Sequence, residues 1–265
     1  MTALHATVQG DRGKPELVLL HGWGAHSGVW KTVLPALEQD FRVTCIDLPG
    51  HGQSPELAEN TLDSWAMAIL DVAPAKAIWL GWSLGGLLAQ KVASMASERI
   101  EKLIVLCSTP KFVASQEWPH AVDEKVFRDF HAEVIREPRA SLLRFIALQT
   151  RGSVTATDDS RLLRKTLLQP EPLATALDAG MRLLLAIDLR QQSKKITCPV
   201  LVLGGERDTL VPAAALPVIA KLFAKAECNV IKQAGHAPFL SHPNEFCEAL
   251  NLFTFNSSAQ YKEAK

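Results

Sequence analysis

The sequence lacks an excess of charge of either sign, because its 28 Lys and Arg residues balance its 28 Asp and Glu residues. A general binder of nucleic acid or membrane surfaces needs a broad basic face, so this balance argues against both classes. No apolar run approaches the ~20 residues that span a bilayer. The first residues, MTALHATVQGDRGKPE, lack a basic segment followed by an apolar one. We therefore expect no membrane span and no signal peptide.

Paired cysteines are also missing. The five cysteines are scattered along the chain, and no two of them form a CxxC motif. An odd, unpatterned set favours free thiols in the reducing cytoplasm over a disulfide framework or a zinc site. These residues are Cys45, Cys107, Cys198, Cys228 and Cys247.

What the chain does have is a regular alternation of apolar runs and amphipathic stretches. The runs are rich in β-branched residues and apolar on both sides, as expected of parallel strands buried on both faces. The alternation predicts an α/β protein with a mostly parallel central sheet and helices on both faces. The predicted strands are 16–20, 42–46, 77–80, 102–106, 199–203 and 229–231, and the predicted helices 28–38, 61–73, 84–96, 212–223 and 243–253.

One long interval breaks the alternation, since four helical patterns and no convincing strand lie between 106 and 199. A single crossover between parallel strands needs only about a dozen residues. We therefore predict a core formed by 1–110 and 191–255, a helical lid inserted at 111–190, and a polar tail at 256–265.

The stretch IWLGWSLGGLL places Ser83 between a predicted strand and a predicted helix, with Gly81 and Gly85 two residues away on either side. This G-x-S-x-G pattern is typical of a nucleophilic serine on a tight strand-to-helix turn, where the flanking residues must be small. We predict that Ser83 is a nucleophile.

A nucleophilic serine needs a base, and the base needs an acid that orients it. PVLVLGGERD runs from a late strand into Asp208, and NVIKQAGH runs from the last strand into His236. Ligands bind at the carboxyl ends of the strands in such folds, so we predict Asp208 as the acid and His236 as the base. Glu206 is the alternative acid, and His242 is a weaker alternative base.

The stretch LVLLHGWG ends a predicted strand with His21, Gly22 and Trp23. We expect the Trp23 N–H, together with that of Leu84, to form an oxyanion hole, and the Trp23 side chain to form a wall of the acyl pocket. For His21 we favour a structural hydrogen bond. DLPGHGQS at 47–54 reads as a tight structural turn near the site.

Together HGW, DLPGHGQS, GWSLGG, the acid after a strand and GHAPF resemble the alpha/beta-hydrolase superfamily over roughly 1–110 and 190–255. The resemblance implies that fold and a Ser-Asp-His triad, and it leaves the substrate open.

Further stretches resemble one branch of this superfamily, the pimeloyl-[acyl-carrier protein] methyl ester esterases of biotin synthesis. They include LLHGWGAHSGVW, SQEWP, RFIALQT and GHAPFLSHPNEFC. This resemblance implies a cytoplasmic, monomeric serine esterase without metal or cofactor that removes a methyl group from a pimeloyl chain on acyl carrier protein and spares the thioester.

The same resemblance implies roles for the lid. One segment would line the acyl channel, and basic residues would dock the acidic carrier, although their positions match the family only in part. The channel residues are Phe145, Ile146, Ala147, Leu148 and Gln149, and the docking residues are Arg139, Arg144, Arg161 and Arg164.

Two other functions stay open at this point. The chain could be a general short-chain carboxylesterase or thioesterase with the same triad and no dedicated carrier. It could also be a small-molecule receptor on the same fold, although an intact Ser, Asp and His set argues against a receptor.

Overall fold

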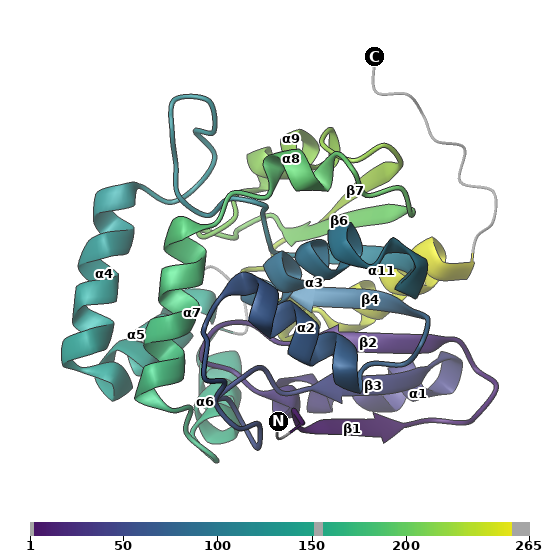
Figure 1. Cartoon of the computed structure of the whole chain (residues 1–265), viewed down its shortest axis with the longest axis horizontal. Helices are drawn as coiled ribbons and strands as arrows, with labels where there is room; N and C mark the ends of the chain where they lie inside the picture. The colour runs from purple at the N-terminus through teal and green to yellow at the C-terminus, as the bar shows by residue number, and fades with distance from the viewer. Residues whose placement is uncertain (1–2, 151–155, 256–265) are drawn as a thin grey trace.

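A computed structural model describes residues 3–150 and 156–255 of the chain. Its centre is a seven-stranded sheet in the order β1-β3-β2-β4-β5-β6-β7, in which β1 alone runs antiparallel to its neighbour (Figure 1). The five inner strands of this order, β3, β2, β4, β5 and β6, are almost entirely buried, as their apolar sequences predict. The strands are Ala6–Gln9, Glu16–Leu20, Arg42–Ile46, Ala77–Trp82, Ile100–Leu106, Val200–Gly205 and Ala226–Ile231.

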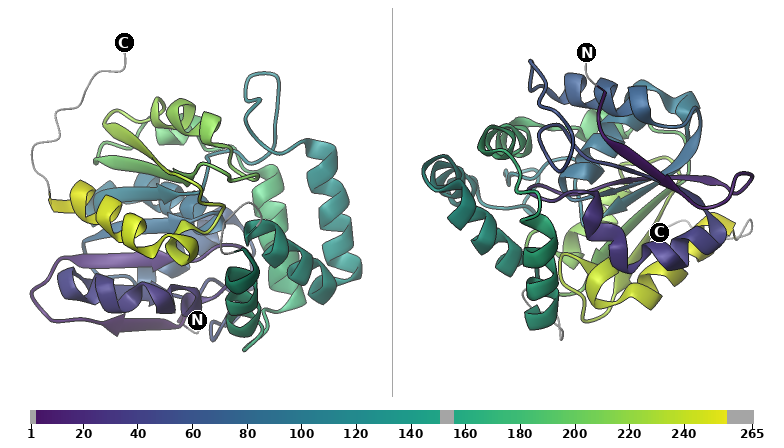
Figure 2. Two further views of the ribbon diagram at one scale, coloured as in Figure 1. Left: turned by 180° about the vertical axis from the view of Figure 1, so that it is seen from behind. Right: turned by 90° about the horizontal axis from the view of Figure 1, so that it is seen from below.

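Helices cover both faces of the sheet, so that the sheet lies between two helical layers (Figure 2). One face carries α2 and α3, and the other carries α1 and α11. A capping box between Thr61 and Ser64 begins α2, which explains why that helix starts where the sequence predicts. The helices are α1 Leu34–Asp40, α2 Leu62–Val72, α3 Leu84–Met95, α9 Leu216–Ala220, α10 Pro238–Ser241 and α11 Pro243–Phe255.

The structure differs from the sequence prediction in three elements. The edge strand β1 was not predicted, because its four residues are half exposed and too short to show a pattern. The predicted helix 28–38 is a 3-10 helix, Ser27–Thr32, followed by α1, since Pro35 in the first turn of α1 has no N–H to continue the earlier helix. The predicted helix 212–223 is likewise a 3-10 turn, Ala213–Ala215, followed by the short α9, whose first turn contains Pro217.

Between β5 and β6 the described residues form four long helices and the short α8, Arg190–Ser193. The four long helices lie beyond the carboxyl edge of the parallel strands, at the left of Figure 1, whereas α8 lies apart from them and contacts α3 through Ser193 and Gln90. The Asp123 carboxylate caps the first of them by accepting from the N–H groups of Lys125 and Val126. The division into core and lid at 111 and 190 stays a prediction, and the predicted tail lies outside the described residues. The four helices are α4 Glu124–Arg136, α5 Pro138–Thr150, α6 Ala156–Leu167 and α7 Ala174–Ala186.

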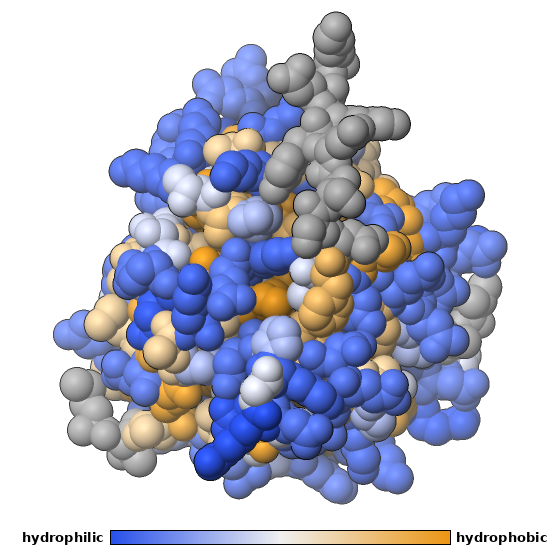
Figure 3. Space-filling view, turned by 90° about the vertical axis from the view of Figure 1, so that its right-hand side faces the viewer, coloured by the Kyte–Doolittle hydropathy of each residue, from blue (hydrophilic) through white to orange (hydrophobic). Residues whose placement is uncertain are grey.

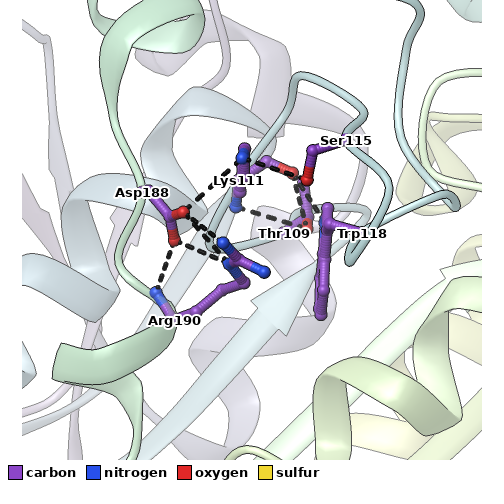
Figure 4. A network of polar contacts seen from close by, with 6 residues as sticks. All are labelled: Thr109, Lys111, Ser115, Trp118, Asp188 and Arg190. Atoms are coloured by element: carbon purple, nitrogen blue, oxygen red, sulfur yellow. Dashed lines mark hydrogen bonds and ion pairs between the residues drawn. The ribbon is translucent and has the colours of Figure 1, made fainter.

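The two segments that connect these helices to the sheet are joined by a polar network (Figure 4). Asp188 pairs with Arg190 at 2.7 Å and with Lys111 at 3.6 Å, and the indole N–H of Trp118 donates to the Lys111 carbonyl. The guanidinium of Arg190 lies 5.6 Å from the centre of the Trp118 ring. The Arg190 side chain donates hydrogen bonds to Asp188 and holds the pKa of that carboxyl below its ordinary value. The entry to the helical segment is thereby fixed to its exit.

Within the described residues, no helix is both long and apolar enough to cross a membrane. The end of the molecule opposite α4–α7 is mostly hydrophilic, and its apolar residues form small separated spots in the coloured part of that face (Figure 3). An apolar cavity lies at the carboxyl edge of the sheet, beside Ser83.

Candidate active site

Ser83 lies on the turn between β4 and α3 with φ 55° and ψ −117°, a backbone conformation that non-glycine residues rarely adopt. Hydrogen bonds hold this turn in place. The Ser83 N–H donates to the Leu106 carbonyl at 3.0 Å, and the Ser83 carbonyl accepts from the Ser108 hydroxyl at 2.6 Å. The serine is therefore fixed at the carboxyl edge of the sheet by its neighbour β5.

The two glycines that flank Ser83 are required by close backbone contacts. A Cβ atom on Gly81 would lie 2.2 Å from the Gly85 carbonyl oxygen, and one on Gly85 would lie 2.4 Å from the Leu20 carbonyl oxygen. Both distances are far shorter than a real contact, so neither position can hold a side chain without moving the backbone. The packing of this turn explains the G-x-S-x-G pattern physically.

Asp208 and His236 meet beside this turn. His236 Nδ1 lies 2.8 Å from Asp208 Oδ2, and because an ionised carboxylate can only accept, Nδ1 carries the proton. Asp208 Oδ1 accepts from the N–H groups of Leu210 and Val211 at 2.8 and 3.0 Å. His236 Nε2 is buried and has no hydrogen-bond partner among the described residues. The ring thus presents one unoccupied nitrogen, as a general base must.

The alternative acid and base lie elsewhere. Glu206 is exposed, and its carboxylate accepts from the Gln233 N–H at 2.9 Å. His242 Nδ1 contacts the hydroxyl of its neighbour Ser241. Neither contact connects these residues to Ser83, so the geometry favours Asp208 and His236, although the triad stays a prediction.

The loop after β2 approaches the serine closely, since a Cβ on Gly22 would lie 3.2 Å from the Ser83 Cβ. Among the residues that the structure describes, neither the Trp23 N–H nor the Leu84 N–H has a hydrogen-bond acceptor. The Trp23 indole N–H donates to the Leu177 carbonyl at 2.8 Å, which ties this loop to α7. Two free N–H groups are what an oxyanion hole requires.

A cavity of about 140 Å³ opens at Ser83, which is the one polar residue among the described residues that line it. Side chains from the loop after β5, from α4, α5 and α7, and from the loop after β6 form the wall. The rim is exposed, because 60% of Val126 is accessible to solvent, whereas Ser83 is only 3% exposed. The remaining lining residues are Phe112, Val122, Phe127, Phe130, Phe145, Leu148, Met181, Leu184 and Leu210.

The five predicted channel residues on α5 lie in different places. Phe145 and Leu148 line the cavity with Ser83, and Ile146 is fully buried. Ala147 lines a shallow groove against α6. The main-chain carbonyl of Gln149 accepts a hydrogen bond from the His236 N–H at 3.2 Å. Trp23 does not line the cavity but packs edge-on against Phe145, with ring centres 4.9 Å apart.

Three of the predicted docking arginines are already paired. Arg144 contacts Glu133 at 2.9 Å, Arg161 contacts Asp158 at 3.5 Å, and Arg139 pairs with Glu171. Arg164 lies with Arg161 on the groove that Ala147 also lines. A docking role would require these exposed pairs to exchange partners, which costs little in water.

Beneath the loop that follows β2 lies a buried pair of histidines, of which the sequence suggested His21 as a structural residue. His21 Nδ1 donates to the Gly22 carbonyl, and its Nε2 accepts from the Leu48 N–H at 2.9 Å. His51 Nε2 accepts from the Gly24 N–H at 3.3 Å. Burial lowers the pKa of His21 to about 3 and the pKa of His51 to about 4, so both rings are neutral. They join the turn at 47–54 to the loop that carries Trp23.

Cys107, which the sequence identified only as a buried thiol, lies beside the acid and the base. Its Sγ, a carboxylate oxygen of Asp208 and a ring nitrogen of His236 lie within 4.8 Å of one another. Such a set could ligate a metal ion, but the hydrogen bond between Nδ1 and Oδ2 already occupies two of its atoms. The signal that could have found Cys107 is its place directly after β5, between the strands of the serine and the acid.

Comparisons with known proteins agree with this geometry. A family model of the alpha/beta hydrolase fold matches residues 15–243. The chain is 40% identical to a pimeloyl-[acyl-carrier protein] methyl ester esterase of Klebsiella pneumoniae over 239 residues, which cover 90% of this chain and 93% of the relative. The chain belongs to the alpha/beta hydrolase family, and the predicted fold class is confirmed.

Solved structures support the same fold. An esterase from Exiguobacterium antarcticum matches with a TM-score of 0.83 and 22% identity, covering 93% of each chain. A hydrolase from Pseudomonas aeruginosa matches with a TM-score of 0.76 and 26% identity, covering 94% of this chain and 92% of the other.

Proposed function

We propose that this protein is a serine carboxylesterase that hydrolyses the methyl ester of a pimeloyl chain carried on acyl carrier protein, in biotin synthesis. The observation that carries the proposal is the apolar cavity that begins at Ser83 and ends at an exposed rim, beside the hydrogen-bonded pair of Asp208 and His236. The Klebsiella relative named for this reaction supports the choice of substrate.

The chemistry follows from the positions of the three side chains. His236 Nε2 accepts the Ser83 proton as the serine oxygen attacks the ester carbonyl, and the ionised Asp208 stabilises the imidazolium that forms. The Trp23 and Leu84 N–H groups stabilise the negative charge on the carbonyl oxygen. His236 then gives its proton to the methoxy oxygen, so that methanol leaves and the acyl group stays on Ser83. His236 afterwards takes a proton from the water that attacks this acyl group and returns it to the Ser83 oxygen as the carboxylic acid is released.

The shape of the cavity supports selection of the ester over the thioester. The buried end holds Ser83, and the walls offer carbon atoms from side chains such as Phe130 and Leu184. Methylene groups of an acyl chain gain free energy in such a site, whereas the bulky carrier must stay outside the rim near Val126. The group that reaches Ser83 is therefore the far end of the chain, where the methyl ester lies.

The docking of the carrier is proposed for the exposed arginines of α5 and α6. Acyl carrier proteins are acidic, and opposite charge accelerates association in a salt-dependent manner. The proposal also includes a monomer in the cytoplasm. All five cysteines are free thiols, which supports a reducing compartment.

The test compares pimeloyl-carrier methyl ester with p-nitrophenyl butyrate, each at low and high salt. We expect a strong preference for the carrier substrate that salt erodes, and no salt effect on the small ester. The double variant R144E/R161E should lower kcat/KM for the carrier substrate alone. Lys76→Glu, an equal charge change per site on an exposed loop between α2 and β4, is the control.

Equal use of both esters without a salt effect would favour a general short-chain esterase. Turnover of neither ester would favour a receptor. Either result would overturn the proposed substrate.

A further inference from the structure

The end of β5 lies between the two halves of the proposed catalytic machinery. In the sheet, β5 is the neighbour of β4, which leads to Ser83, and of β6, which leads to Asp208. Cys107 and Ser108, the two residues that follow β5, therefore lie between these halves, and each of them faces one half. Ser108 is already accounted for, because its buried hydroxyl donates to the Ser83 carbonyl at 2.6 Å. Cys107 faces the other half.

The backbone of Cys107 holds an uncommon conformation. Its φ is 45°, one of three positive values among the described non-glycine residues, and all three follow strands at the carboxyl edge of the sheet. The Cys107 N–H donates to the Leu203 carbonyl at 2.8 Å, which continues the ladder to β6. Strained backbone of this kind persists where the surroundings fix it, and it is common at functional sites.

The Cys107 thiol is placed to act as a donor. Burial, followed by the nearby charge of Asp208, raises the pKa of the thiol well above its ordinary value. The thiol therefore keeps its proton and is neither a nucleophile nor a metal-binding thiolate. Its Sγ lies within 4.8 Å of an Asp208 carboxylate oxygen, and because a carboxylate can only accept, the protonated thiol is the group of the two that can donate.

The Asp208 carboxylate has room for this bond. Its two oxygens offer about four lone-pair sites. Leu210 and Val211 donate to Oδ1, and His236 donates to Oδ2, so three donors are in place. One lone-pair site is thus left for a fourth donor, and a donor on the side of β5 would oppose rotation of the carboxylate away from His236.

We infer that Cys107 is a positioning residue of the triad, which donates its S–H to the Asp208 carboxylate and fixes the orientation in which that carboxylate accepts from His236. Because the S–H takes up part of the negative charge of the Asp208 carboxylate, it also limits how strongly that carboxylate stabilises the His236 imidazolium. This inference rests on the proposed triad and adds to it a residue that no G-x-S-x-G or strand-end pattern contains.

The test measures kcat and KM separately for p-nitrophenyl butyrate between pH 5 and 9. We expect Cys107→Ala to lower kcat about tenfold and to leave KM unchanged, because a weak donor to a charged group is lost. The acidic limb of its kcat/KM profile should also move to higher pH by roughly half a pH unit. The reason is that a less neutralised Asp208 carboxylate holds the proton on His236 more firmly. Cys107→Ser, which keeps a donor of similar size, should restore both properties.

Cys45→Ala is the matched control. Cys45 is equally buried, at the end of β3, and burial raises the pKa of its thiol to about 12. Its loss should lower the free energy of unfolding without changing kcat or the pH profile. If Cys107→Ala behaved like Cys45→Ala, or if Cys107→Ser failed to restore the profile, Cys107 would be a packing residue and the inference would be wrong.

Ser83→Ala in the same assay separates this inference from the proposed function. An active Ser83→Ala would overturn the triad and with it the role of Cys107. An inactive Ser83→Ala beside an unchanged Cys107→Ala would overturn the role of Cys107 alone.

Discussion

The carboxyl edge of the sheet and the helices α4, α5 and α7 form opposite walls of one cavity, yet they are built differently. At the sheet edge, Ser83, Asp208 and His236 are all at most 5% exposed, and short hydrogen bonds fix the acid and the turn of the nucleophile. The helices present apolar side chains to the cavity and exposed ion pairs, such as that between Arg144 and Glu133, to solvent. From this difference we propose that the sheet edge carries out the reaction and the helices select the substrate.

The variant with the largest expected effect abolishes the reaction and leaves the cavity that selects the substrate in place. Ser83→Ala should lower kcat by roughly 10⁴ to 10⁶, because the other described residues that line the cavity carry no nucleophile. Ser94→Ala, on the same helix α3, should turn over normally. Steady-state kinetics with p-nitrophenyl butyrate measure both, and near wild-type activity of Ser83→Ala would contradict the mechanism.

The next prediction tests whether Asp208 or Glu206 is the acid that orients His236. Asp208→Asn should keep the fold and lower kcat by about 10⁴, since an amide would favour the wrong tautomer of the imidazole. Glu206→Gln is the matched change on the exposed neighbour and should cost little. A larger loss in Glu206→Gln than in Asp208→Asn would show that the acid is misassigned.

A substitution on the helices should change the preference between substrates and leave the rate of the chemical step as it was. Leu148→Trp narrows the cavity, so kcat/KM for p-nitrophenyl octanoate should fall roughly 10- to 200-fold while p-nitrophenyl acetate is used as before. Ala147→Val, one residue earlier but facing the groove beside α6, should leave the ratio of the two esters unchanged. An equal loss for both esters in Leu148→Trp would mean that α5 takes part in the reaction itself.

The smallest effect concerns the two buried histidines under the loop that follows β2. Their pKa values, about 3 for His21 and about 4 for His51, lie below that of an unfolded histidine, so the unfolded chain binds more protons below pH ~6.5. Stability should therefore fall on acidification from pH 6.5 towards 4, by about 1.4 kcal/mol per histidine per pH unit. Urea unfolding at pH 7.5 and 5.0 measures the fall, and His51→Gln should reduce it. A loss of stability in that window that His51→Gln leaves unchanged would contradict this assignment.

The sequence predicts the sheet edge better than it predicts the helices that face it. The strand-end residues and the turn around Ser83 were predictable, because each depends on a few neighbouring residues and on one rule about where parallel strands end. The cavity wall was predictable only in part, since Phe130, Met181 and Leu210 come together through tertiary packing of α4, α7 and the loop after β6. The strand β1 and the place of Cys107 depend on strand order, which no local pattern records.

The measurement that tests the account most directly is rapid acid quenching of the enzyme with pimeloyl-carrier methyl ester, followed by mass spectrometry of the peptide that contains Ser83. Attack on the methyl ester releases methanol and leaves Ser83 joined through the pimeloyl chain to the carrier. The account predicts this large adduct. A Ser83 peptide that bears only a methyl pimeloyl group, with free carrier released, would show attack on the thioester and contradict the selection that the cavity is proposed to make.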